Sequence, residues 1–210
     1  MKRILYVSLL CLGTLSFSGC NHLLDIKPVN SMIPVSVEDY EAVLVGGYPK
    51  TEFFMKTELM TDNVYANLYC TYDAPKNQEP WYVWASTHQL PDEENDAYWG
   101  QLYSSVYYAN TILDEFEQRV PSESEKELFE TVKGEAYALR AYSYFYLVNL
   151  YADVYGKDNL DKPGVPMPLT AEDVHKNTHD NVREPIGKVW EQIVKDLNEA
   201  TKYLAGKTPK

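Results

Sequence analysis

Apolar side chains recur at helical spacing along four segments of the chain, and this pattern predicts a protein built mainly from α-helices. The shortest helix is expected over residues 36–47, where Ser36 stands at an N-cap position and acidic residues follow it. Three longer helices are expected over residues 98–119, from Pro121 to about residue 151, and over 185–204. Ser122 and Glu125 predict a capping box at the start of the second long helix.

The helix expected after Pro121 differs from the others because apolar residues surround it completely from residue 137 onward. Such a helix should be buried on several sides. The small residue Gly134 would let a neighbouring helix approach closely. Arg140 lies in this apolar stretch, and a buried guanidinium needs a carboxylate or carbonyl partner. An internal ion pair, or a clamp on a neighbouring loop, is therefore expected at Arg140.

The last helical segment carries one apolar stripe, and no later helix follows it in this sequence. The stripe is expected to pack on the second long helix through Trp190 and Leu197, while its remaining apolar residues stay exposed. Successive antiparallel helices of this kind predict a tetratricopeptide-like helical repeat, in which each unit buries its apolar face on the next.

Two stretches interrupt the helical pattern with proline, glycine, asparagine and aspartate, at residues 67–97 and 154–182. Both are expected to lack long elements. A loop as long as the first, inside a compact domain, usually carries function.

The N-terminus has the order of a bacterial lipoprotein signal. Lys2 and Arg3 precede an apolar run that is too short to span a bilayer, and the small residue Gly19 stands before Cys20. The alternative is an ordinary secretory signal with an incidental cysteine. The lipoprotein interpretation divides the chain into a signal peptide (1–19), a tether (20–35) and a helical domain (36–210). It makes Cys20 the lipidation site, an acylated (palmitate-type) anchor in a membrane.

Charge and the lack of known motifs disfavour nucleic-acid binding, enzymatic activity and metal binding. The formal net charge is -12, which disfavours nucleic acid as a partner. No nucleophile elbow, Walker loop or dinucleotide fingerprint appears, so no enzyme and no cofactor are expected. His175 and His179 are four residues apart but lie in a proline-rich connection, and no metal site is expected there.

The candidate ligand site lies in the first irregular stretch. Sugar rings stack their C–H faces on aromatic rings, and their hydroxyls need donors and acceptors nearby. Both requirements are met by a cluster of aromatic, amide and acidic residues: Trp81, Tyr82, Trp84, Asn77, Asp92 and Asn95. The alternative is that Trp81 and Trp84 fold back as a small core beneath the loop.

Five segments, taken in order, resemble the N-terminal part of the SusD/RagB family. They are residues 20–28, 58–62, 99–110, 134–150 and 182–200. The resemblance implies a surface-exposed, lipid-anchored protein of the cell outer membrane. Such a protein would bind glycan nutrients and deliver them to a partner SusC-like TonB-dependent transporter. Family members are more than twice this length, so the resemblance also implies that the chain is an N-terminal portion. A helical-repeat scaffold that binds a protein or peptide, without sugar affinity, remains the alternative.

Overall fold

The computed structural model describes residues 33–50, 57–65, 79–85, 97–176 and 182–207. Contacts divide the chain into two units, Met1–Pro34 and Val35–Lys210, and every helix described below belongs to the second. In chain order the helices are α2 (Val37–Gly47), α4 (Glu79–Tyr82), α5 (Ala97–Gln118), α6 (Lys126–Tyr151), α7 (Ala171–Lys176) and α8 (Ile186–Leu204). Within the described residues the only β-type pairing is an isolated bridge between Pro163 and Pro185, which confirms the mainly α class.

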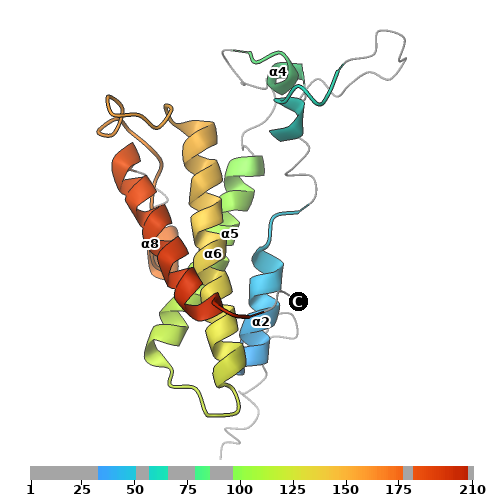
Figure 1. Ribbon diagram of the computed structural model, residues 1–210, viewed down its shortest axis with the longest axis vertical. Helices are drawn as coiled ribbons and strands as arrows, with labels where there is room; N and C mark the ends of the chain where they lie inside the picture. Colours follow the sequence, from blue (N-terminus) through green and yellow to red (C-terminus); the bar gives the residue numbers. More distant parts are fainter. Residues whose placement is uncertain (1–32, 51–56, 66–78, 86–96, 177–181, 208–210) are drawn as a thin grey trace, which may run out of the picture. The chain divides into compact units, whose positions relative to one another are not determined.

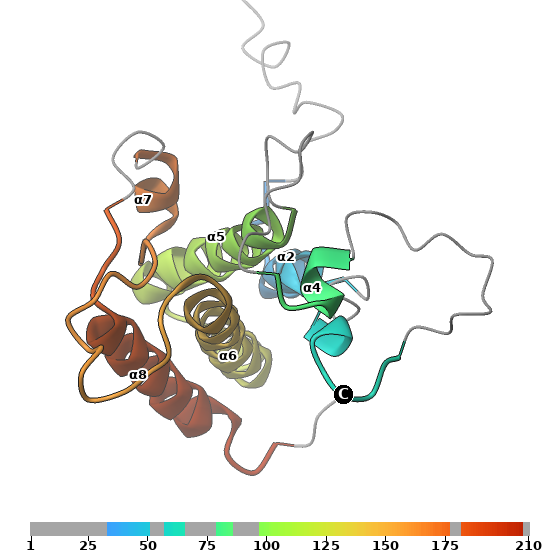
Figure 2. The same cartoon turned by 90° about the horizontal axis from the view of Figure 1, so that it is seen from above.

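Helix α6 is central in the helical layer. It packs against α5 and α8, while α2 lies against both α5 and α6 (Figures 1 and 2). One buried cluster joins α2, α5 and α6. In it the ring centroid of Phe116 lies 5.3 Å from that of Tyr40 and 4.2 Å from that of Phe129. A second cluster joins α5, α6 and α8 around the fully buried Tyr144. These two clusters confirm that α6 is buried on several sides.

Helix α6 and helix α8 are in close contact at Gly134. A Cβ atom added to Gly134 would lie 2.7 Å from Cγ of Leu204 and 2.9 Å from Cβ of Tyr203. The last turn of α8 can therefore lie against α6 only because residue 134 has no side chain, as the sequence predicted.

Local capping explains where helix α2 begins. Ser36 caps α2: its hydroxyl accepts a hydrogen bond from the Asp39 N–H at 3.1 Å, and the Asp39 carboxylate accepts from the Ser36 N–H at 2.9 Å. The predicted capping box at Ser122 is wrong. Helix α6 begins only at Lys126, and the Ser122 hydroxyl donates to the Glu125 carboxylate at 2.6 Å within a turn that precedes the helix. The Ser122 hydroxyl therefore does not cap α6, whose N-cap residue, Glu125, makes no side-chain capping bond.

The buried face of α8 also differs from the expected one. The sequence predicted contact through Trp190 and Leu197 and exposure of the other apolar residues. Instead Ile186, Val189, Ile193 and Ala200 are buried, Trp190 is half-buried and Leu197 is 49% exposed. Asp196 takes the inward position instead. It can face the core because Arg140 of α6 supplies the charge that its carboxylate needs.

Arg140 makes both of the contacts that the sequence left open. Its Nε and Nη2 donate to the two carboxylate oxygens of Asp196 at 2.8 Å each, and its Nη1 donates to Oδ1 of Asn110 at 2.9 Å and to the carbonyl of Leu169 at 3.2 Å. Desolvation lowers the pKa of Arg140, but the bonds and charge of Asp196 outweigh it and the net pKa is raised. The guanidinium thus joins α5, α6, α8 and the loop before α7.

The loop between α6 and α7 is held by further buried groups. The phenols of Tyr103 and Tyr144 donate to the carbonyls of Pro166 and Pro168, each at 2.6 Å, and burial raises the pKa of both. The N–H of Ala171 donates to Asp114 of α5 at 2.7 Å. Helix α7 begins at that bond, whereas the sequence predicted only a connection there. Thr170 also caps this helix locally, because its hydroxyl accepts a hydrogen bond from the Asp173 N–H at 3.1 Å.

Candidate functional site

The single turn of α4 places two tryptophans in opposite environments. Trp81 is 7% exposed, and its ring lies 6.1 Å from the ring of Tyr98 at the start of α5. Tyr82 is partly buried. Trp84 follows the end of the turn and is 68% exposed. The sequence grouped these aromatics together, and the structure separates Trp81, which packs, from Trp84, which is presented to solvent.

The backbone at Trp84 explains this separation. Its φ angle is 51°, in the left-handed region, and its N–H donates to the Trp81 carbonyl at 3.4 Å. Within the described residues Trp84 is the only non-glycine residue with positive φ. A bulky side chain in this region costs on the order of 1–3 kcal/mol, and such conformations cluster at binding sites. The turn therefore ends in a strained backbone that directs a large ring outward.

Four other predicted site residues lie outside the described residues: Asn77, Asp92, Asn95 and the lipidation residue Cys20. Their predicted roles stay predictions. The side chains of His175 and His179 are likewise not described. In the part of the chain that is described, no group of three or more His, Cys, Asp or Glu side chains could hold a metal ion. Over the same residues, no helix is both long enough and apolar enough to cross a membrane.

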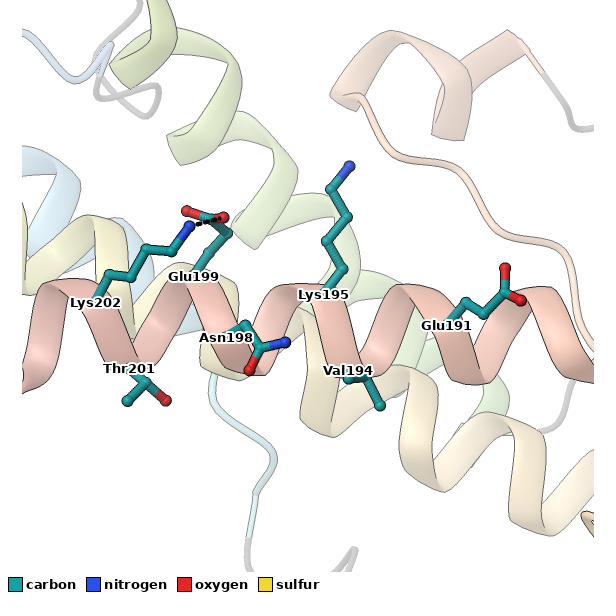
Figure 3. Close-up of a pocket in the computed structure, with 7 residues that line it drawn as sticks. All are labelled: Glu191, Val194, Lys195, Asn198, Glu199, Thr201 and Lys202. Carbon is teal, nitrogen blue, oxygen red and sulfur yellow. Dashed lines mark hydrogen bonds and ion pairs between the residues drawn. The ribbon is translucent and has the colours of Figure 1, made fainter.

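The outer face of α8 forms a shallow hollow of about 680 Å³ whose lining residues all belong to this one helix. Figure 3 shows Val194 and Thr201 on one side and the longer side chains of Lys195 and Lys202 on the other; Lys202 pairs with Glu199 at 2.6 Å. The hollow offers no aromatic ring. Its chemistry is that of a helix surface, with the exposed Val194 as its apolar part.

Comparison with known proteins places this arrangement in a family. A family model described as "Starch-binding associating with outer membrane" (SusD-like) matches residues 23–209. A curated relative, SusD-like protein P38 of Formosa agariphila, is 24% identical over 96% of this chain. The chain spans 37% of that relative's length.

Two solved structures share the fold. A SusD superfamily protein from Bacteroides thetaiotaomicron superposes with a TM-score of 0.64 at 22% identity, over 80% of this chain and 37% of the other. A candidate sugar-binding protein from Bacteroides vulgatus gives a TM-score of 0.61 at 22% identity, over 86% of this chain and 40% of the other. The tetratricopeptide-like fold is therefore confirmed, and because the family model spans nearly the whole chain, this protein belongs to the SusD-like family.

Proposed function

We propose that this protein is a non-enzymatic lipoprotein of the outer-membrane surface that binds a glycan and delivers it to a SusC-like TonB-dependent transporter. The SusD-like family model, with its description as starch-binding and outer-membrane-associated, supports the ligand class and the location. The lipid anchor at Cys20 and the transporter partner rest on the sequence motif and on the resemblance.

The observation that carries glycan binding is the exposed ring of Trp84. If Trp84 served only to fill the core, a strained backbone that turns its ring to solvent would not stabilise the fold. A flat apolar face with a polar edge suits a sugar ring, whose C–H face is apolar and whose rim carries hydroxyls. Trp81 holds the turn in place, because its ring contact with Tyr98 joins α4 to the long helix α5.

The test compares Trp84→Ala with Trp81→Ala and with the exposed neighbour Val83→Ala as the matched control. Binding is measured by calorimetry against maltohexaose, xylohexaose and mannohexaose. Stacking of a flat ligand on an aromatic ring is worth about 1–3 kcal/mol, so Trp84→Ala should weaken binding roughly 5- to 150-fold without lowering the melting temperature. Trp81→Ala should lower the melting temperature, and Val83→Ala should change neither.

The outcomes separate the two candidate functions. Unaltered sugar affinity in Trp84→Ala would remove Trp84 from the binding site. Absence of binding to all three oligosaccharides would favour the helical-repeat scaffold, which binds protein or peptide through exposed apolar faces such as that of α8.

A further inference from the structure

A second groove lies where the end of α2 crosses the first half of α5. It has a volume of about 400 Å³, within the range of about 300–1,000 Å³ typical of small-ligand sites. Its walls are the chain from Gly46 to Lys50 on one side and Gln101, Ser104 and Tyr108 of α5 on the other. Trp84 does not line it, so this groove is separate from the site proposed above.

The groove has fixed walls. A Cβ atom added to Gly47 would lie 2.9 Å from Cβ of Tyr108 and 3.1 Å from Cδ2 of Leu139, so the backbone of α2 lies directly against α5 and α6. The buried hydroxyl of Ser105 donates to the Gly47 carbonyl at 2.6 Å. The neighbouring residue Gly46 is different, because an added Cβ there meets no atom within 4 Å. The open space of the groove therefore begins at Gly46.

The lining combines ring faces with hydrogen-bonding groups. Tyr48, 45% exposed, and Tyr108 supply aromatic surface. Gln101 supplies an amide that both donates and accepts, Lys50 supplies three donors, and Ser104 supplies a hydroxyl that donates to the Gly100 carbonyl and can still accept.

We propose that this groove is a second carbohydrate subsite that takes a neutral, hydroxyl-rich sugar ring. The inference deepens the proposed function and rests on it for the ligand class. The lining carries one cation, Lys50, beside the negative end of the α2 dipole, so the two charges oppose each other, and the uncharged amide and hydroxyl groups favour a neutral ring. The mixed aromatic and amide lining also fits a sugar better than an apolar ligand.

The test fills the groove without altering its walls. Gly46→Leu places a side chain in the open space, and Gly156→Leu is the matched control, since its added Cβ likewise meets no atom within 4 Å and Gly156 does not line the groove. Amide NMR spectra are recorded during titration with maltohexaose, xylohexaose and mannohexaose. A parallel titration uses an acidic oligosaccharide, hexagalacturonate.

At least one neutral oligosaccharide should shift the Gly46 amide and the Gln101 side-chain amide in the unmodified chain. Gly46→Leu should weaken the affinity reported by the Gln101 side-chain amide at least tenfold while leaving the shifts of the Trp84 indole intact. Trp84→Ala, which removes the indole signal, should leave the Gln101 shifts intact, and Gly156→Leu should change neither the Gln101 nor the Trp84 shifts.

Shifts at Trp84 with none at Gly46 or Gln101 would overturn the second subsite and leave the proposed function standing. Shifts at Gln101 that survive Gly46→Leu would overturn it as well. Binding in the groove by hexagalacturonate alone would overturn the neutral assignment. Shifts at neither place, with any neutral oligosaccharide, would overturn both proposals together.

Discussion

Replacing Asp196 by asparagine should destabilise the helical domain more than any exposed charge change on α8. Asp196 and Arg140 have side chains only 1% and 7% exposed, and they share two bonds of 2.8 Å. Gln192 adds a third bond to the same carboxylate at 2.8 Å. The substitution Asp196→Asn would keep the shape of the side chain but leave the guanidinium buried without its counter-charge.

The size of the effect follows from that burial. Removing one partner of a buried ion pair costs about 3–5 kcal/mol. A domain of ordinary stability has only about 5–15 kcal/mol in total. Asp196→Asn should therefore lose about a fifth or more of the free energy of unfolding. It should also loosen the loop before α7, because the Leu169 carbonyl shares the same guanidinium.

Urea unfolding followed by circular dichroism measures this loss. Glu199→Gln is the matched control on the same helix, because its ion pair with Lys202 is exposed and should be worth no more than about 0.2–1 kcal/mol. The double variant Arg140→Met with Asp196→Leu should be less destabilised than the sum of its single changes, since it removes both charges. A loss in Asp196→Asn as small as that of the control would refute the buried pair.

Three further outcomes are expected. Cys20→Ser should move the protein from the membrane fraction to the soluble fraction, and a variant that stays bound while the wild type carries no acyl label would contradict the anchor. Burial, assisted by Glu135, raises the pKa of Tyr48 from 10.0 to about 12, so the protonated phenol stabilises the fold fully below pH 10 and this stability is lost as the pH rises toward 12. In urea titrations Tyr48→Phe should reduce that alkaline loss of stability. The same dependence of unfolding free energy on pH in the variant and the wild type would count against this role of Tyr48. Val194 and Leu197 are 54% and 49% exposed, so the Cys20→Ser protein should self-associate or bind an apolar dye, and Leu197→Glu should reduce both; a dye-negative monomer at micromolar concentration would contradict this expectation.

Helical periodicity predicted the long helices of this fold because the apolar stripes are local in sequence. Arg140 was predicted to need a partner, but the identity of that partner was not, since Asp196 lies on another helix. The hydrophobic pattern assigned Leu197 to the core because it does not record which residues of the other helices α8 faces. Polarity alone cannot show that a carboxylate faces inward; here Asp196 does so beside Ile193 because its charge is paired with Arg140.

The candidate site was predicted only in part. Trp81 and Trp84 are three residues apart and have the same chemistry, so the sequence could not distinguish them. Their difference arises from the end of α4 at Tyr82 and the left-handed backbone at Trp84, which no side-chain pattern encodes. The groove between α2 and α5 was not predicted, because Gly46 and Gln101 meet only through packing.

Oxidative footprinting of Trp84 tests glycan binding most directly. The chain is treated with N-bromosuccinimide, and each tryptophan's oxidation rate is read by peptide mass mapping, with and without a saturating oligosaccharide from the panel above. Trp84 should react faster than the buried Trp81, and the oligosaccharide should slow the reaction of Trp84 while leaving Trp81 unchanged. Oxidation of Trp84 at the same rate with and without every oligosaccharide would contradict the proposed function.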